Sequence, residues 1–374
     1  MKIIQFGTGR FLRGFFAPIV SETKSITVVQ SRLNSSGADE INAQPDGYHV
    51  WTRGIEKGET VDRFEKVESI DRAIVAQTEW TQLLERFCDP QMQLIVSNTT
   101  AAGLNLDESD AEYVAETCPS SFPAKLASLL FQRFKQGEPV PCVLPLELVE
   151  NNASQLRQLV EKQIEIWGSG DPELVSPEFK EWFAQIRWLN NLVDRIVVSP
   201  SDDPPWKSVD HLAVVGEPFR MLAIEDDGKG HEPIPQDPMI TWAPDLSRFF
   251  LRKVRILNGL HTAMVAKFLP QGFETVLECV SKPESRKWLE EVLHEEILPA
   301  LDSLGLEERE FAAQVMERFE NPFFEHRLSD IANGHETKLD VRIRPTVLDF
   351  EKANGNPPPR LSEVLDTKLP AGVG

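Results

Sequence analysis

The sequence predicts an α/β protein in which a doubly wound sheet domain is followed by a mainly α-helical domain. Short apolar runs of strand length alternate with helical stretches through the N-terminal part of the chain, and two glycines follow the first run directly. From about Ser247 onward, apolar residues recur with helical spacing and few strand signals remain. Strands that alternate with helices build a mostly parallel sheet that is covered on both faces.

The expected strands of the first domain are compact apolar runs that end at turn residues. They are residues 2–6, 26–30, 94–98 and 142–148. Helical stretches lie between or after them, at residues 11–22, 122–135 and 151–167. The last of these begins beside Asn and Ser residues, which are typical N-caps. We expect this domain to cover residues 1–245.

The remaining residues, 246–374, are expected to form the helical domain. A loop rich in Gly, Pro and acidic residues, 225–238, precedes it and is typical of a connector or a mobile flap. The tail, 353–374, carries Pro and Gly and predicts irregular structure. The main helices are expected at residues 253–269, 285–305 and 308–321.

Composition excludes several classes of partner. The chain has 374 residues, 41% of them hydrophobic and 26% charged, which is enough for two globular domains. Its net charge of −20 argues against nucleic acid, because binding phosphate backbones requires a basic surface. The sequence has no run of about 18 apolar residues, so no membrane span is expected. The first residues do not have the pattern of a signal peptide, so none is expected. We expect a monomer or small homo-oligomer.

The four cysteines are too far apart in sequence to suggest a disulfide framework or a zinc site. The spacing favours a reducing compartment, and therefore the cytoplasm. The seven histidines show no metal-ligand spacing, so no metal is expected. These cysteines are Cys88, Cys118, Cys142 and Cys279.

Gly7 and Gly9 follow the first expected strand and predict a dinucleotide site. Two glycines there allow a tight turn and let the backbone approach a pyrophosphate. The third glycine of a strict GxGxxG pattern would fall on Leu12, and the next glycine is Gly14. The pattern is therefore degenerate, and a plain strand-to-helix turn remains the alternative.

The end of the second expected strand leaves NAD and NADP open. An acidic residue usually follows that strand and binds the adenosine ribose of NAD. Here Gln30, Ser31 and Arg32 follow instead, so no carboxylate would repel a 2′-phosphate and Arg32 could pair with one. Alternatively, Arg32 stacks on adenine or faces solvent, and Ser31 or Gln30 binds the ribose of NAD. Asn98 and Thr99 end another strand, where they either bind a ligand or form a turn.

Lys253 begins a short apolar segment that also carries Asn258 and His261. On an ideal helix, apolar side chains share the direction of Lys253, with His261 about 80° and Asn258 about 140° away. A lysine held against apolar surface loses hydration, so its pKa falls and it becomes usable as a general base. The alternative is a lysine that packs its stem on apolar neighbours and keeps its amine in water.

Lys338 and Arg342 lie four residues apart on an expected helix or turn. Together they could form a cationic pocket for a substrate carboxylate, which an arginine binds with two parallel hydrogen bonds. Ordinary surface charge is the alternative.

Seven runs, in order from residue 5 to residue 345, resemble the mannitol dehydrogenase family of long-chain polyol dehydrogenases. They are most similar to its tagaturonate reductase (altronate oxidoreductase) branch. The runs are QFGTGRFLRGFF, SNTTAAGL, PLELVENNASQL, LVDRIV, KVRILNGLHTA, RFENPFFEHRL and TKLDVRIRP.

The resemblance implies a Rossmann-like domain, a helical domain, NAD or NADP as cofactor, and no metal. It implies that Lys253 is the catalytic acid/base, that Asn152 and Asn258 hold the reacting oxygen, and that His261 binds substrate. Lys338 and Arg342 are the further candidates for substrate binding. The residues expected at the cofactor are Gly7, Thr8, Gly9, Arg10, Phe11, Ser31, Arg32, Asn98 and Thr99.

The activity that the resemblance implies is the interconversion of a keto-hexuronate, tagaturonate or fructuronate, with its aldonate, altronate or mannonate. Its partner would then be a small sugar acid or polyol. Two alternatives stay open. One is a mannitol-type polyol 2-dehydrogenase. The other is a non-catalytic paralogue that binds a dinucleotide or sugar acid, which the chain suggests by ending sooner than is usual for the family.

Overall fold

The computed structural model describes residues 1–99, 103–200, 210–301 and 308–369. Packing divides the chain into two compact units. The first, here the sheet unit, contains Met1–Thr52 and Arg63–Leu246, and the second, the helical unit, contains Arg53–Asp62 and Ser247–Gly374. The segment Arg53–Asp62 therefore belongs to the helical unit, whereas the sequence predicted a single boundary near residue 245.

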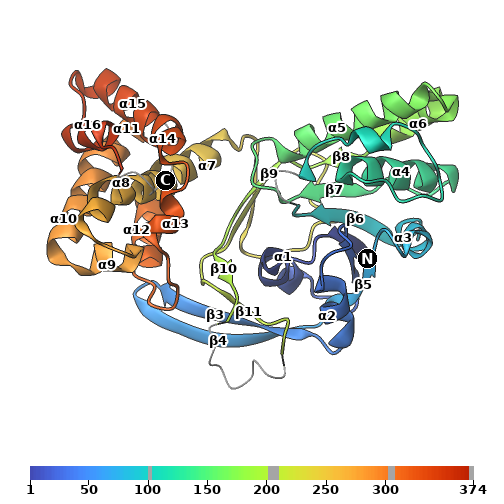
Figure 1. Ribbon diagram of the computed structural model, residues 1–374, viewed down its shortest axis with the longest axis horizontal. Coiled ribbons are helices and arrows are strands. Elements are labelled where there is room, and N and C mark those ends of the chain that lie inside the picture. Colours follow the sequence, from blue (N-terminus) through green and yellow to red (C-terminus); the bar gives the residue numbers. More distant parts are fainter. Residues whose placement is uncertain (100–102, 201–209, 302–307, 370–374) are drawn as a thin grey trace. The chain divides into compact units, whose positions relative to one another are not determined.

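The sheet unit is organised around a parallel sheet, whose six described strands run in the order β5-β2-β1-β6-β7-β8 (Figure 1). In order of appearance along the chain this is 3-2-1-4-5-6, the order of dinucleotide-binding sheets. The four expected strands are confirmed as β1, β2, β6 and β7, although β7 ends at Pro145. The strands are β1 (Lys2–Phe6), β2 (Ile26–Gln30), β5 (Ile70–Val75), β6 (Met92–Ser97), β7 (Cys142–Pro145) and β8 (Arg187–Trp188).

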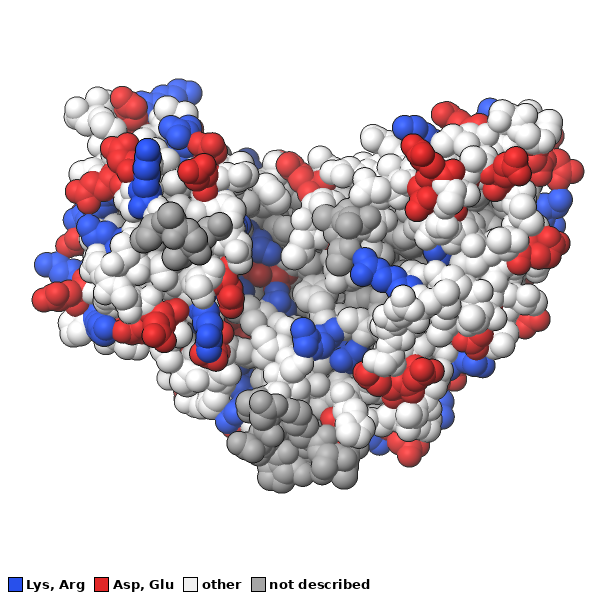
Figure 2. Space-filling view, viewed as in Figure 1, with Lys and Arg blue, Asp and Glu red and all other residues white. Residues whose placement is uncertain are grey.

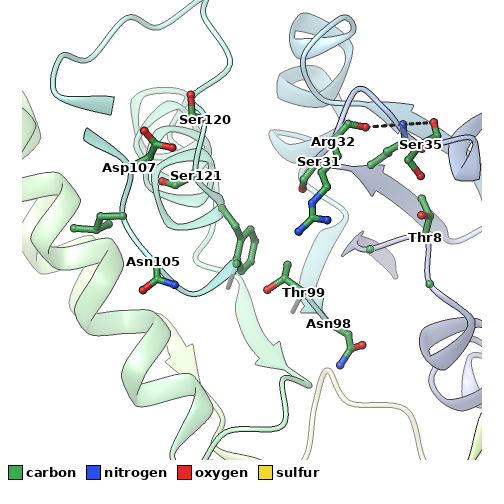
Figure 3. Close-up of a pocket in the computed structure, with 16 residues that line it drawn as sticks. Thr8, Ser31, Arg32, Ser35, Asn98, Thr99, Asn105, Asp107, Ser120 and Ser121 are labelled. Atoms are coloured by element: carbon green, nitrogen blue, oxygen red, sulfur yellow. Dashed lines mark hydrogen bonds between the residues drawn. The ribbon is translucent and has the colours of Figure 1, made fainter. Parts of the chain in front are cut away.

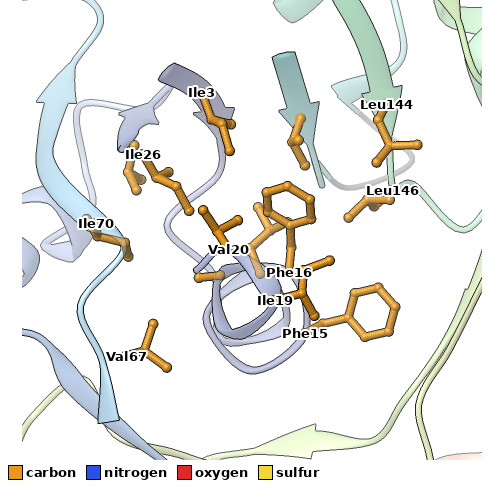
Figure 4. Packing of buried hydrophobic residues seen from close by; sticks show 14 of the residues in the cluster. Ile3, Phe15, Phe16, Ile19, Val20, Ile26, Val67, Ile70, Leu144 and Leu146 are labelled. Carbon is orange, nitrogen blue, oxygen red and sulfur yellow. The ribbon is translucent and has the colours of Figure 1, made fainter. Parts of the chain in front are cut away.

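Both faces of this sheet are covered, because successive residues of its strands point to opposite sides. Ile3 belongs to a core cluster with Phe15 and Phe16 on one face (Figure 4). Its neighbour Ile4 belongs to a second cluster, with Leu129, on the other face. The doubly wound class predicted from the sequence is therefore confirmed.

The helices of the sheet unit connect these strands. Ser121 caps α4, since its hydroxyl accepts a hydrogen bond from the Ala124 N–H, and α4 covers the expected residues. The helix expected at 11–22 is shorter. The helices are α1 (Arg10–Phe15), η1 (Ala17–Ile19), α2 (Gly37–Ala43), α3 (Trp80–Phe87), η3 (Glu108–Asp110), α4 (Phe122–Lys135), α5 (Asn152–Gly168), η4 (Pro172–Val175) and α6 (Pro177–Ala184).

Two smaller sheets, with the strand orders β10-β11-β3-β4 and β13-β12-β9, were not predicted. The loop expected as a flap, 225–238, is tied down by Arg187, which pairs with both Asp227 oxygens at 2.8 and 2.7 Å and donates to the Gly230 carbonyl. The strands are β3 (Tyr48–Glu56), β4 (Glu59–Val67), β9 (Asn191–Asp194), β10 (Val197–Val198), β11 (Val214–Gly216), β12 (Met221–Glu225) and β13 (Ile240–Ala243).

The helical unit contains α-helices interrupted by π-helical segments, three of them within its described residues. Its first elements are α7 (Ser247–Arg252), η5 (Lys253–Asn258), α8 (Gly259–Phe268), η6 (Leu269–Gln271), α9 (Val276–Ser281), α10 (Pro283–Glu291), η7 (Val292–Ile297) and α11 (Leu298–Leu301). These are followed by α12 (Glu308–Phe319), α13 (Leu328–Ala332), α14 (His335–Lys338), η9 (Leu339–Ile343), α15 (Arg344–Asn354) and α16 (Pro359–Asp366). The π-helical segments are η5, η7 and η9.

The tail expected to be irregular forms α16 instead. Glu296 is buried, and its carboxylate accepts hydrogen bonds from the backbone N–H groups of Arg360 and Leu361 at 3.0 and 2.8 Å. A carboxylate at a helix start satisfies backbone donors that would otherwise lack partners. This contact between residues far apart in sequence explains why the tail's composition alone was misleading.

The tip of the β3–β4 hairpin packs against α12. Lys57 and Gly58 both have positive φ, 55° and 78°, and form a two-residue turn. Their N–H groups donate to the Glu317 carboxylate at 3.2 and 2.9 Å. The Arg53 guanidinium lies 3.9 Å from the centre of the Phe323 ring, which also holds this segment in the helical unit.

The visible surface carries Lys and Arg interspersed with Asp and Glu (Figure 2). The net charge of −20 is therefore spread rather than gathered in one block on this face. Of the helices described, none has the length and apolar character needed to cross a membrane.

Candidate active site

A pocket of about 520 Å³ opens where β1, β2 and β6 end (Figure 3). Ligands bind at this edge in open α/β sheets. Seven of the residues expected at the cofactor line it: Gly7, Thr8, Gly9, Ser31, Arg32, Asn98 and Thr99.

The glycine turn has the shape that a phosphate group requires. Gly7 has φ +125°, a conformation that favours glycine, and a Cβ there would lie 3.2 Å from the Asn98 carbonyl oxygen. At Gly9 a Cβ would meet nothing within 4 Å, so the missing side chain leaves space for a ligand. Gly14 serves packing instead, since its Cβ would lie 2.6 Å from Val197.

The loop after β2 is held by a buried glutamine. The Gln30 amide donates to the carbonyls of Arg32 and Ser35 at 2.8 and 2.9 Å and accepts from the Ala38 N–H at 2.8 Å. Gln30 is therefore engaged by the protein, whereas the Arg32 guanidinium points into the pocket (Figure 3). Within the described lining, Asp107 is the one acidic residue.

The opposite wall of the pocket was not predicted. It comes from the long connection between β6 and α4 and includes Asn105, Asp107, Ser120 and Ser121 (Figure 3). Asp110 fixes this connection, because its carboxylate accepts from the N–H groups of Ser120 and Ser121 at 2.6 and 2.8 Å. The N-cap pattern at Ser121 was the local signal available in the sequence.

Arg10 and Phe11 do not line this pocket. Arg10 donates to the Ser199 hydroxyl at 2.6 Å, and the Phe11 ring stacks on Phe15. Arg13, which was not among the expected site residues, holds the glycine turn by donating to the Thr8 carbonyl. It is buried, which lowers the pKa of its guanidinium.

The Asn152 amide is hydrogen-bonded within the protein, which favours a supporting role over the expected contact with the reacting oxygen. It is 1% exposed, and its Nδ2 lies 2.8 Å from the Pro145 carbonyl and 3.2 Å from that of Glu147. Its Oδ1 accepts from the Ala153 and Asn191 N–H groups at 2.9 and 3.1 Å. Both amide hydrogens and the oxygen are used within the protein, so this side chain fixes the turn before α5.

The helical unit places Lys253 and Asn258 at the two ends of the π-helical segment η5. In a π-helix the hydrogen bond joins residues five apart, and such segments are frequent at functional sites. Residue i+5 therefore lies close to one turn from residue i, rather than 140° away. The structure corrects the α-helical geometry expected from the sequence and turns Asn258 toward the side of Lys253.

Asn258 differs from Asn152, because its amide has no hydrogen-bond partner among the described residues. Both Lys253 and Asn258 are partly exposed. No hydrogen bond to the Asn258 side chain occurs among the described residues, while its backbone carbonyl accepts from the Thr262 hydroxyl at 2.9 Å. The Asn258 amide can therefore donate to a ligand oxygen.

His261 follows on α8 and is 8% exposed. Its ring centre lies 4.7 Å from those of Phe319 and His326. Burial lowers the pKa of His261 well below 6.5, and the charges of His326, Arg318, Arg342 and Lys338 lower it further. The imidazole is therefore neutral at pH 7, with one nitrogen to donate and one to accept. Its buried Nε2 has no partner within the described structure.

Arg342 and Lys338 gather beside His261. The Arg342 guanidinium lies 3.4 Å from the Thr262 hydroxyl, the neighbour of His261. The Lys338 ammonium donates to the Ile331 carbonyl at 2.8 Å. Burial lowers the pKa values of both side chains, and the charge of Arg342 lowers that of Lys338 further. Within the residues described, neither cation pairs with a carboxylate, so both can bind a substrate anion.

The described residues hold no group of three or more His, Cys, Asp or Glu side chains arranged to bind a metal.

Comparison with family models and known proteins adds to this geometry. A model described as the mannitol dehydrogenase Rossmann domain matches residues 1–235, and one described as the mannitol dehydrogenase C-terminal domain matches residues 245–366. The altronate oxidoreductase of Halalkalibacterium halodurans is 34% identical over 378 residues, which are 96% of this chain and 72% of that protein. The Bacillus subtilis altronate oxidoreductase is 34% identical over 381 residues, covering 96% and 77%.

Solved structures share the fold. Substrate-free D-sorbitol dehydrogenase superposes with a TM-score of 0.78 at 21% identity, covering 94% of this chain and 76% of that one. Pseudomonas fluorescens mannitol 2-dehydrogenase, in a ternary complex with NAD and D-mannitol, superposes with a TM-score of 0.74 at 18% identity, covering 98% and 77%.

Proposed function

The chain belongs to the mannitol dehydrogenase family, and on that premise we propose that it is an NAD(P)-dependent oxidoreductase that interconverts a keto-hexuronate and its aldonate. Tagaturonate with altronate and fructuronate with mannonate are the candidate pairs. The observation that carries the substrate class is the pair of cations, Lys338 and Arg342, beside His261. A uronate has a carboxylate for them to bind, and mannitol has none.

The residues of the pocket fit a dinucleotide. Gly7 and Gly9 leave room for a pyrophosphate, and Ser31, Arg32 and Thr99 would contact the remainder. When bound, this cofactor exchanges a hydride with the substrate carbon that carries the reacting oxygen. Because Arg32, and no acidic residue, follows β2, the pocket is compatible with NADP as well as NAD. Turnover with NADH and with NADPH, in the wild type and in an Arg32→Ala variant, tests which cofactor is used.

Lys253 acts on the reacting oxygen. In the oxidation direction its amine takes the hydroxyl proton, and in the reduction direction its ammonium returns a proton to the same oxygen. Asn258 donates a hydrogen bond to this oxygen as negative charge develops on it. His261, being neutral, holds a sugar hydroxyl. Asn152 supports the sheet unit instead, through the turn before α5.

The test is turnover of purified protein with tagaturonate, fructuronate and fructose, followed by the absorbance of NADH or NADPH. We expect reduction of at least one uronate and much slower reduction of fructose. Reduction of fructose without reduction of either uronate would establish the polyol alternative. Cofactor binding without turnover of any of the three would favour the non-catalytic alternative.

A further inference from the structure

Glu147 is a buried carboxyl group that the proposed reaction does not use. It lies two residues beyond the end of β7 and is 2% exposed. No ion pair to a Lys or Arg occurs within the described residues, and burial raises the pKa of this carboxyl above its usual range. Burying such a group costs free energy unless its oxygens are well satisfied.

The oxygens of Glu147 are satisfied by one short segment at the end of β6. Oε1 accepts from the Thr99 N–H at 2.8 Å and from the Thr99 hydroxyl at 3.1 Å. Oε2 accepts from the Ser97 hydroxyl at 3.1 Å. A carboxylate only accepts hydrogen bonds, so it suits a site that presents three donors.

This segment forms part of the wall of the dinucleotide pocket. Asn98 and Thr99 line the pocket, and the Asn98 carbonyl oxygen lies 3.2 Å from the position of a Cβ on Gly7. On its other side, Thr99 lies 2.7 Å from the position of a Cβ on Gly103. Any movement of the segment therefore changes the space beside the glycine turn.

We propose that Glu147 is a positioning residue for the cofactor, which holds Asn98 and Thr99 in place from behind the pocket wall. Asn152 supports Glu147 in turn, because its amide donates to the Glu147 carbonyl at 3.2 Å. The inference rests on the proposed function, since it assumes that the pocket takes a nicotinamide dinucleotide. It assigns the buried charge to cofactor affinity, which a purely structural carboxyl would not affect.

The test compares Glu147→Leu, Glu147→Gln and the control Glu150→Gln, which alters an exposed carboxylate in the same turn. The dissociation constant of NADH, from fluorescence titration, should rise about tenfold in Glu147→Leu because hydrogen bonds to a charged acceptor are lost. In Glu147→Gln the dissociation constant of NADH should rise less, since an amide oxygen still accepts from the Thr99 N–H. Glu150→Gln should match the wild type. At saturating NADH, kcat should change little in all three.

A second comparison separates positioning from loss of folding. Ser97→Ala removes one donor to Glu147 without altering a residue that lines the pocket, so its effect on NADH affinity should not add to that of Glu147→Leu. A Glu147→Leu protein with a lower melting temperature but wild-type NADH affinity would overturn the inference. Wild-type protein that binds NADH but reduces no uronate would instead overturn the proposed function, and the Glu147 measurements would still decide the role of this residue. Wild-type protein that binds neither NADH nor NADPH would overturn both.

Discussion

The two units of this protein assemble their candidate site residues in different ways. In the sheet unit, backbone turns line the pocket, and buried side chains such as Gln30 and Glu147 hold those turns from behind. In the helical unit, the residues proposed for the chemistry, Lys253 and Asn258, are the two ends of the π-helical segment η5. Binding a large cofactor requires a fixed surface, whereas proton transfer requires side chains that reach the substrate.

The two asparagines show this difference within one residue type. Asn152 is 1% exposed and has each of its polar atoms paired within the protein, whereas Asn258 is partly exposed and its amide has no partner in the described structure. The family resemblance assigns both to the same oxygen. The geometry supports that role for Asn258 and a supporting role for Asn152.

The largest expected effect comes from removing the acid/base of the helical unit. Lys253→Ala should lower kcat by about a thousandfold at neutral pH, because a positioned general acid/base typically contributes about a hundredfold to ten-thousandfold. NADH affinity should stay unchanged, since the pocket residues belong to the sheet unit. Steady-state turnover of a uronate and an NADH titration measure both quantities. Lys287→Ala, which alters a lysine with a 77% exposed side chain, is the control. Turnover that survived Lys253→Ala would contradict the catalytic assignment.

The next effect sharpens the comparison of the asparagines. Asn258→Ala should lower kcat about a hundredfold through the loss of an oxygen-binding donor, with little change in melting temperature. Asn152→Ala should instead lower the free energy of unfolding by about 2 kcal/mol, because it leaves buried donors and acceptors unpaired. Kinetics and denaturant unfolding of both variants check this. If Asn152→Ala were fully stable but catalytically impaired, the family's assignment would hold here after all.

A smaller effect is expected at the cations. Arg342→Met should raise KM for a uronate by about thirtyfold, because a hydrogen bond between two charged groups is lost. KM for fructose, which lacks a carboxylate, should not change. Initial rates over a range of each substrate test this, with Arg344→Met, which alters an exposed arginine at the start of α15, as control. Equal losses for both substrates would show that Arg342 does not select the carboxylate.

The smallest effect concerns the dependence of stability on pH. The folded pKa of His261 lies below that of the unfolded chain, 6.5, so only the unfolded chain gains this proton as the pH falls from 6.5 toward the folded value. The contribution of the neutral imidazole to the free energy of unfolding is therefore complete above pH 6.5. It decreases as the pH falls toward the folded pKa, by up to about 1.4 kcal/mol per unit of pKa difference. His326, whose pKa is also lowered by burial, adds in the same direction.

Denaturant unfolding at several pH values measures this decrease. His261→Phe keeps a ring against Phe319 and should flatten the profile, whereas the exposed His294→Gln should leave it unchanged. A profile as steep in His261→Phe as in the wild type would place the proton uptake elsewhere.

Sequence reasoning was most successful where local chemistry determines the structure. The glycine turn was predicted because two glycines follow the first apolar run, and Gly7 does adopt a positive φ. Four strands of the parallel sheet were predicted because they are continuous apolar runs. The two smaller sheets were missed. Exposed residues dominate β4, so no apolar run indicates that strand. The strands β11 and β12 are buried but short, with three and five residues.

The helical unit was harder to predict in detail. Apolar spacing indicated helices, but it does not distinguish an α-helix from the π-helical segment η5, which packs against η9 far away in the sequence. The roles of Asn152 and Asn258 could not be separated either, since the difference lies in their partners. Lys338 and Arg342 were identified from their spacing and chemistry, whereas Glu147 was recognised as important only from its three donors.

The tip of the β3–β4 hairpin has a practical consequence for dissecting the molecule. Residues 53–62 are translated early, whereas the residues that they contact, Glu317 and Phe323, are translated near the end. A gene fragment that encodes only residues 247–374 would therefore yield a polypeptide that lacks one of its own parts. Adding the hairpin as a separate peptide should complete the helical unit. The two units are therefore better separated as complementing fragments than by dividing the chain at one position.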